Sequence, residues 1–111
     1  MKYKIAVGSR DGKAVNEHFG GCSKFTIITV DEESSTYKFT GFINIEPPCN
    51  GGEHSDDGLE AAAKALSGCR IVLVARIGIG AQLVLERHGI DVLEYYGLIE
   101  DALKRIIQYY R

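Results

Sequence analysis

The chain has 111 residues, of which 45% are hydrophobic and 25% charged, with 13 glycines and two prolines. This length fits one domain and this composition is that of an ordinary soluble globular protein, which excludes a multidomain enzyme and a disordered or fibrous chain. The formal net charge of −2 provides no general basic field, so the sequence does not favour nonspecific nucleic-acid binding.

The first half of the chain predicts three strands. Lys2–Val7 alternates and is rich in β-formers, Lys24–Val30 is mostly β-branched, and Tyr37–Ile45 alternates again with aromatic and β-branched residues. The polar segment DEESST between the second and third strands has the length of a hairpin loop. We therefore expect these two strands to pair antiparallel.

The segment EPPCNGGEHSDDG follows the third strand and predicts a long surface loop. It contains both prolines and three glycines and has no hydrophobic period. Loops of this length in a small domain usually serve a function. The end of the segment, Ser55–Asp57, supplies a helix cap and N-terminal negative charge.

The second half of the chain predicts helices and strands in alternation. The expected elements are a helix at Leu59–Leu66, a buried strand at Arg70–Arg76, a helix at Ala81–His88, a strand at Ile90–Tyr96 and a helix at Leu98–Tyr110. The order β-β-β-α-β-α-β-α predicts a single α/β domain with a five-stranded mixed sheet. Ligands of such sheets bind at the carboxyl ends of the parallel strands, here the first and fourth.

Cellular context follows from the N-terminus and the cysteines. Residues 1–13 lack the apolar run of a signal peptide, and the longest apolar run, Ile71 to Ala75, is too short for a membrane span, so we expect a cytoplasmic protein. The three cysteines Cys22, Cys49 and Cys69 are odd in number and widely spaced. They predict neither a disulfide framework nor a self-sufficient zinc or iron–sulfur cage.

A first candidate site is the turn VNEHFGGC, which contains His18 and Cys22. Imidazole and thiolate both bind iron, zinc or copper, so His18, aided by Cys22, is a candidate ligand of a metal or cluster. The alternative is a structural turn in which Phe19 packs in the core, His18 is solvated and Cys22 is a small buried hydrophobe.

A second candidate site is CNGGEH in the long loop, where Cys49 and His54 have a spacing close to that of common metal ligands. If the two loops converge, His18, Cys22, Cys49 and His54 could form a Cys₂His₂ shell. If they do not, each loop offers one or two ligands to a preassembled cofactor. The alternative is a polar linker without a ligand.

A third candidate site is RIGIGA, a glycine-rich turn from a buried strand into a helix. Arg76 offers a positive charge, and Gly78 and Gly80 leave the backbone amides accessible to an anion. The turn matches neither the dinucleotide nor the Walker fingerprint. The alternative is a tight turn without a ligand.

Other candidates are expected to be structural. His88 lies at a helix end, Cys69 opens a buried strand, and Asp56, Asp57 and Glu60 crowd a helix N-terminus. The chain contains no GxSxG or HExxH motif and no credible Ser/His/Asp set, so we expect a binding protein and not an enzyme. A two-metal nuclease is disfavoured because the end of the first strand offers only Asp11.

Three segments together carry a family resemblance over nearly the whole chain. VNEHFG before KFTIITV, then CNGGEH, then the run from LEAAAKAL to GLIEDAL resemble the dinitrogenase iron–molybdenum cofactor biosynthesis family. This family includes small nitrogenase cofactor carriers and the C-terminal domain of the synthase of the cluster precursor. The resemblance implies a ribonuclease H-like fold without nuclease activity, which carries an iron–sulfur or iron–molybdenum cluster as cargo.

The resemblance also assigns residues. His18 matches the histidine of the family's HFG motif, and Cys49 and His54 match a loop found in part of the family, whereas Cys22 stands where small residues are common. Arg76 and the amides from Gly78 to Gly80 would face the negative charge of the cluster. The expected partners are cluster-assembly or acceptor proteins, and the expected state is a monomer or weak dimer. The alternative is a small regulatory or adaptor domain that binds a simple metal ion or a small anion.

Overall fold

A five-stranded mixed sheet forms the centre of the computed structural model, which describes residues 1–47 and 56–110. The strand order across the sheet is β4-β3-β1-β5-β6. The strands are β1 (Lys2–Gly8), β3 (Lys24–Asp31), β4 (Thr36–Asn44), β5 (Ile71–Val74) and β6 (Asp91–Glu94).

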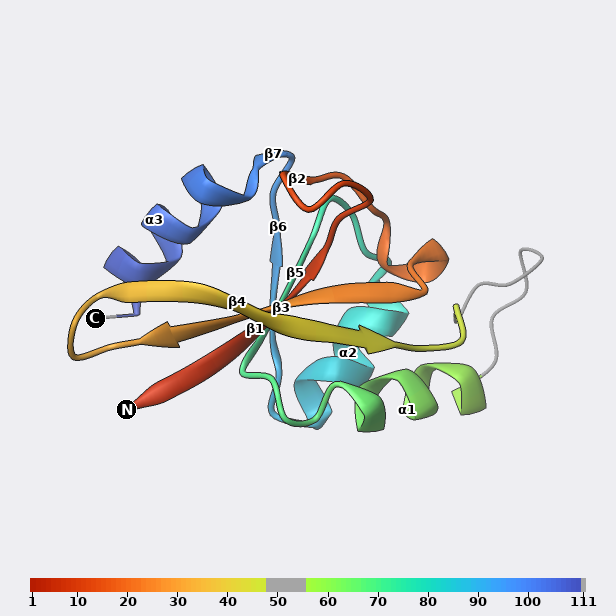
Figure 1. The fold of residues 1–111 in the computed structure, drawn as a ribbon. Coiled ribbons are helices and arrows are strands. Elements are labelled where there is room, and N and C mark those ends of the chain that lie inside the picture. The colour runs from red at the N-terminus through yellow and green to blue at the C-terminus, as the bar shows by residue number, and fades with distance from the viewer. Residues whose placement is uncertain (48–55, 111) are drawn as a thin grey trace.

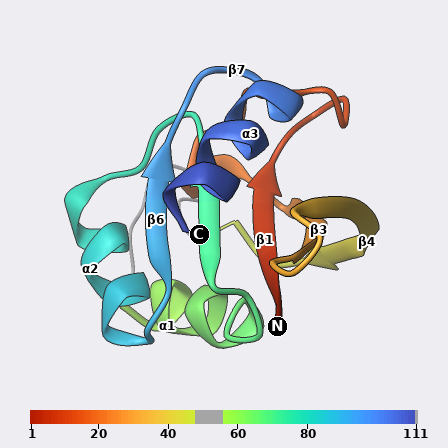
Figure 2. The same ribbon diagram turned by 90° about the vertical axis from the view of Figure 1, so that its left-hand side faces the viewer.

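Three helices cover the two faces of this sheet unequally. Helices α1 (Asp56–Ala65) and α2 (Ile79–Arg87) lie on one face, and α3 (Ile99–Tyr109) lies on the other (Figure 1). Successive residues of a strand point to opposite faces, so β1 supplies both cores: Ala6 packs under α1 and α2, and Ile5 and Val7 pack under α3. Figure 2 shows α3 over the middle of the sheet, with β3 and β4 projecting to one side of it.

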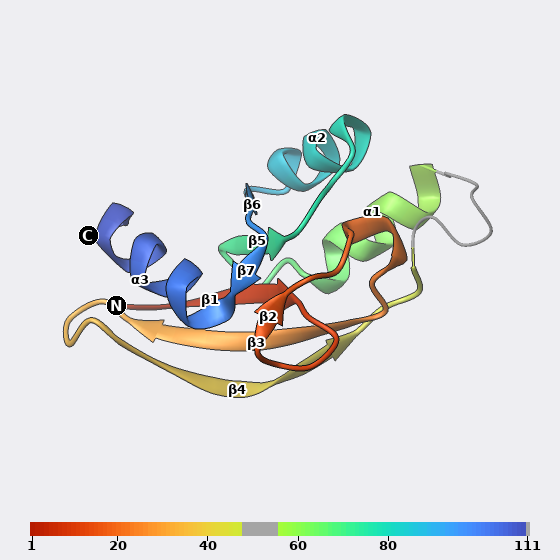
Figure 3. The ribbon, with the colours of Figure 1, turned by 90° about the horizontal axis from the view of Figure 1, so that it is seen from above.

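Strand directions place the ends of three strands together. β3 pairs antiparallel with β1 and with β4, which confirms the predicted hairpin, and β1, β5 and β6 run parallel. Parallel neighbours end at the same edge of the sheet, so the loops that follow β1, β5 and β6 meet there (Figure 3). This edge is the one that the sequence selects as the ligand-binding edge.

Several predicted boundaries were wrong, and one small sheet was missed. β5 ends at Val74, so Arg76 lies in a loop and not in the strand, and α2 begins at Ile79, before the predicted start at Ala81. The short strands β2 (Ala14–Val15) and β7 (Gly97–Leu98) pair antiparallel in a separate sheet. Two residues are too few to show an alternation in sequence.

Among residues 1–47 and 56–110, no helix has both the length and the hydrophobicity needed to cross a membrane.

Candidate functional site

The segment from Glu17 to Phe19 is seated between the ends of β1 and β5. The Glu17 amide donates to the Gly8 carbonyl oxygen at 3.2 Å, and the Glu17 carbonyl oxygen accepts from the Ala75 amide at 3.0 Å. The Phe19 amide donates to the Arg76 carbonyl oxygen at 2.9 Å, and His18 and Arg76 form an isolated parallel bridge. The structure therefore brings two predicted site residues, His18 and Arg76, side by side.

Phe19 anchors this segment in the core, and His18 remains accessible. The Phe19 side chain is 1% exposed and its ring centroid lies 5.8 Å from that of Phe25. His18 precedes a short 3₁₀ helix, η1 (Phe19–Gly21), in an extended conformation, and it is exposed. An exposed imidazole on a backbone fixed by hydrogen bonds is able to act as a ligand.

Gly8 is a site residue that the sequence analysis missed. A Cβ atom at this position would lie 3.0 Å from Val74 Cγ1 and 3.2 Å from Glu17 Cβ. The close approach of the Glu17 segment to the end of β5 thus requires a residue without a side chain at Gly8. A glycine directly after an alternating strand was the available signal.

The segment that follows β5 has an open surface. A Cβ atom built at Gly78 or Gly80 would meet nothing within 4 Å, so neither glycine relieves a contact within the described chain. The Ile77 amide is held by Glu94 Oε2 at 3.0 Å. Glu94, at the end of β6, is a second positioning residue that sequence reasoning did not identify, because its partner is distant in the chain.

Of the two arginines discussed at this edge of the sheet, Arg10 forms an ion pair and Arg76 forms none with the described residues. Arg10 Nε lies 2.9 Å from Glu17 Oε1, which compensates the Glu17 carboxylate. The exposed Arg76 guanidinium forms no ion pair with any residue that the structure describes. An unpaired guanidinium beside accessible backbone amides is suited to a negatively charged ligand.

Cys22 lies inside the core. Its side chain is 1% exposed, and the thiol donates to the Lys24 carbonyl oxygen at 3.3 Å. Burial raises the pKa of the Cys22 thiol to about 11. A thiol that stays protonated is a poor metal ligand, so the geometry favours the packing interpretation.

Cys49 and His54 lie outside the described residues. Among the described residues before this loop, the Ile45 amide donates to the Ser23 carbonyl oxygen at 2.8 Å. Within residues 1–47 and 56–110, no group of three or more His, Cys, Asp and Glu side chains could hold a metal ion.

The remaining sequence candidates have structural roles. His88 Nε2 lies 2.8 Å from Glu60 Oε2 and so ties α2 to α1, and Cys69 is 4% exposed, with its pKa raised by burial. The Asp11 carboxylate accepts from the amides of Lys13 at 2.9 Å and Ala14 at 3.0 Å, which holds the pKa of Asp11 below its usual range. Asp11 therefore shapes the turn after β1.

Sequence comparison assigns the family. The profile of the family described as "Dinitrogenase iron-molybdenum cofactor" matches residues 1–109. The FeMo cofactor biosynthesis protein NifB of Chlorobaculum tepidum is 38% identical over 99 residues, which are 89% of this chain and 22% of that protein. NifB of Sinorhizobium fredii is 36% identical over 105 residues, 93% of this chain and 21% of that protein. The chain thus spans about a fifth of the length of these relatives.

Solved structures share the fold. The crystal structure of PH0822 superposes with a TM-score of 0.69 at 23% identity, covering 96% of this chain and 89% of that one. The apo form of the orange protein from Desulfovibrio gigas gives a TM-score of 0.63 at 19% identity, covering 96% and 88%. With the profile match over nearly its whole length, the chain belongs to the dinitrogenase iron–molybdenum cofactor family.

Proposed function

We propose that this protein is a non-catalytic carrier that holds an iron–sulfur or iron–molybdenum cluster, or a precursor of one, as cargo during metallocluster assembly. The family assignment and the relatives named FeMo cofactor biosynthesis proteins support a role in that pathway and in nitrogen fixation. The observation that carries the proposal is the pairing of the exposed His18 with Arg76 at the carboxyl edge of the parallel strands.

In this proposal His18 is the ligand. The neighbours of His18 fix its main chain through bonds to Gly8 of β1 and to Ala75 and Arg76 directly after β5. The imidazole remains free to bind an iron or molybdenum atom at the surface of a preformed cluster. One side-chain ligand gives weak attachment compared with the four thiolates of a resident cluster. Weak attachment suits a protein that must release its cargo to an acceptor.

Arg76 and the amides of residues 78–80 supply the electrostatic part of the site. A guanidinium without an ion pair among the described residues and amides at the start of α2 both favour the net negative charge of such a cluster. Cys49 and His54, which lie outside the described residues, are proposed as further ligands. Cys22 is assigned to packing, because its thiol is buried and protonated.

Location, partners and fold type complete the proposal. We place the protein in the cytoplasm, with cluster-assembly and acceptor proteins as partners and a ribonuclease H-like fold, which the order of the sheet and the placement of the three helices support. The second candidate function is an adaptor domain for a small anion. Arg76 favours it, because its guanidinium forms no ion pair with the residues that the structure describes. A simple metal ion is less well supported, because the described residues provide no group of three ligands.

An anaerobic titration tests the proposal. The parent protein and the variant His18→Ala are titrated with isolated iron–molybdenum cofactor and with an iron–sulfur precursor, and binding is followed by the visible spectrum. We expect saturable binding by the parent and at least about tenfold weaker binding by the variant. His88→Ala is the matched control, because His88 contacts Glu60 away from this edge. Equal binding by the parent and His18→Ala would exclude His18 as the ligand, and no binding by either would favour the small-anion adaptor.

A further inference from the structure

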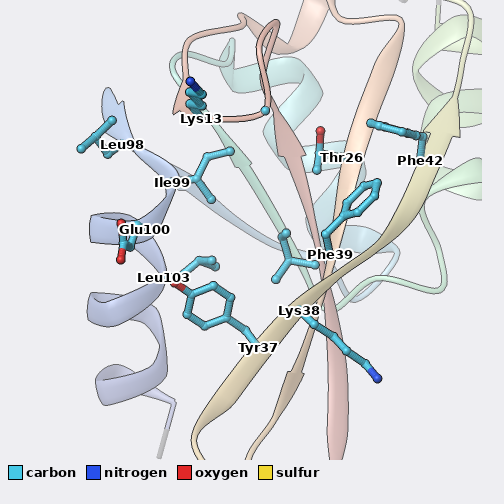
Figure 4. Close-up of a pocket in the computed structure, with 12 residues that line it drawn as sticks. Lys13, Thr26, Tyr37, Lys38, Phe39, Phe42, Leu98, Ile99, Glu100 and Leu103 are labelled. Atoms are coloured by element: carbon cyan, nitrogen blue, oxygen red, sulfur yellow. The ribbon is translucent and has the colours of Figure 1, made fainter.

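A groove of about 770 Å³ lies on the α3 face of the sheet, away from the His18 site. Its lining residues come from α3, from β3 and β4, and from the loop before β2. Figure 4 shows Ile99 and Leu103 of α3 on one side of the groove and the aromatic side chains of β4 on the other. This volume falls within the range of small-molecule binding sites, about 300–1,000 Å³.

A β-bulge creates the aromatic wall of this groove. The register between β3 and β4 shifts at Ile27/Ile28: Phe39 pairs with Ile28 and Gly41 pairs with Ile27, which leaves Thr40 as the extra residue. In a regular strand, Phe39 and Phe42 would lie on opposite faces because they are three residues apart. With the bulge both line the groove, with ring centroids 5.0 Å apart.

These aromatic side chains are unusually accessible. Phe39 is 55% exposed and Phe42 is 52% exposed, although the outward residues of an edge strand are normally polar. Tyr37 extends the same wall. A contiguous and exposed aromatic wall in a concave site indicates a ligand with a flat apolar body.

The groove also contains an unpaired polar group. Thr26 is 6% exposed and lines the groove, and its hydroxyl makes no hydrogen bond to any residue that the structure describes. No buried side-chain nitrogen or oxygen atom of the described residues lacks a hydrogen-bond partner, so the unpaired Thr26 hydroxyl is accessible from the groove and is able to donate to a ligand there.

Positive charge is concentrated near Thr26. Lys24 precedes Thr26 by two residues on the same face of β3, and its ammonium nitrogen lies 4.3 Å from the centroid of the Phe42 ring. Lys13 lines the same end of the groove, whereas Figure 4 shows the amino group of Lys38 directed away from it. Glu100 of α3 is the carboxylate among the lining residues. The local excess of lysine in a chain of net charge −2 favours an anionic group at the Thr26 end.

We propose that this groove binds a small, flat aromatic molecule that carries one carboxylate or sulfonate. The rings lie against Phe39 and Phe42, the anionic group faces Lys24 and Lys13, and the Thr26 hydroxyl donates to it. This site is independent of the proposed cluster site, because it shares no residue with it.

Two fluorescent probes of matched shape test the proposal. Anilinonaphthalene sulfonate is an aromatic anion, and N-phenylnaphthylamine is its neutral counterpart. We expect one sulfonate molecule to bind per chain, with amide NMR shifts at Thr26, Phe39 and Ile99, and with about three- to tenfold higher affinity than the neutral probe. Lys24→Gln is expected to remove most of this difference.

The double variant Phe39→Ser, Phe42→Ser is the main test of the site. Both side chains are more than half exposed, so the core stays intact, and we expect the affinity for both probes to fall at least about tenfold. Tyr109→Ser is the control, because Tyr109 is 81% exposed and does not line this groove. Unchanged affinity in the double variant, or NMR shifts mapped elsewhere, would overturn the proposal. Self-association lost in the double variant, without probe binding, would assign the groove to a second copy of the chain and overturn it as well.

Discussion

The main chains of His18 and Arg76 lie side by side as a parallel bridge, and the amide of Phe19 donates to the Arg76 carbonyl oxygen at 2.9 Å. Backbone contacts, and not side-chain contacts, bring the imidazole and the guanidinium to one edge of the sheet. Substitution of either side chain should therefore leave the position of the other unchanged, which makes the two contributions to cargo binding separately measurable.

Gly8 is expected to be required for this arrangement. In Gly8→Ala the new methyl group would meet Val74 Cγ1 at 3.0 Å and Glu17 Cβ at 3.2 Å. Overpacking of this kind costs about 1–3 kcal/mol, so we expect the urea midpoint to fall and cargo binding to weaken. Gly68→Ala is the matched control, because a Cβ there meets nothing within 4 Å. Equal midpoints for the two variants would contradict the assigned role of Gly8.

Glu94 is expected to stabilise the loop after β5. Its carboxylate accepts from the Ile77 amide at 3.0 Å, a bond that Glu94→Ala removes and Glu94→Gln can retain. A net hydrogen bond of about 0.5–1.5 kcal/mol corresponds to faster exchange of the Ile77 amide by about two- to tenfold in Glu94→Ala. Hydrogen exchange followed by NMR measures this change. If the alanine and glutamine variants exchange at the same rate, the carboxylate does not hold the loop.

Cys22 is expected to resist alkylation in the folded protein. At about pH 8, a thiol with its pKa raised from 9.0 to about 11 has a thiolate fraction roughly a hundredfold below that of an unperturbed cysteine, and burial slows its reaction further. Peptide mapping after iodoacetamide treatment, with and without urea, measures the protection. Rapid labelling of Cys22 in the native protein would return it to the set of candidate ligands.

The raised pKa of Cys22 also makes stability depend on pH. Folding favours the protonated thiol, so this contribution to the free energy of unfolding is present below about pH 9 and is lost as the pH rises through about 11.

Tyr110 is expected to titrate late. Its hydroxyl donates to Asp91 Oδ2 at 2.8 Å, and burial, followed by this hydrogen bond, raises the pKa of Tyr110 to about 12. The folded state favours the neutral phenol, so its stabilising effect is complete below about pH 10 and is lost as the pH rises through about 12. Burial also raises the pKa of Tyr3, so near-ultraviolet absorbance should show a late phase in the ionisation of the six tyrosines, with a smaller amplitude in Tyr110→Phe. An unchanged late phase in that variant would refute the assignment to Tyr110.

Much of the fold could be predicted because its signals are local. The β-branched residues of Lys24–Val30, the hairpin segment after it and the apolar run at Ile71 each reflect packing on a sheet face, which acts over a few residues. The mini-sheet of β2 and β7 could not be predicted in this way, because two-residue strands form only when distant loops meet. The sequence analysis placed Arg76 in a strand for a related reason. The apolar pattern does not show that β5 stops pairing with β6 after Val74.

The site could be predicted only in part, because its contacts join residues that are far apart in the sequence. The residue types at His18 and Arg76 indicated ligand and anion chemistry, but their pairing depends on how the loops meet. Gly8 and Glu94 act by contact with Val74 and Ile77 and have no motif of their own. For Cys22 the sequence left ligation and packing open, since either role suits a cysteine beside a glycine turn.

Pulsed electron paramagnetic resonance of the cargo-loaded protein tests the central claim most directly, because it detects a nitrogen atom bonded to the cluster. The parent protein is loaded anaerobically with iron–molybdenum cofactor and compared with His18→Ala and with the control His88→Ala. We predict an imidazole nitrogen coupling in the parent and in His88→Ala that is absent from His18→Ala. The same coupling in His18→Ala, or none in the parent while cofactor is bound, would contradict the assignment of His18 as the ligand.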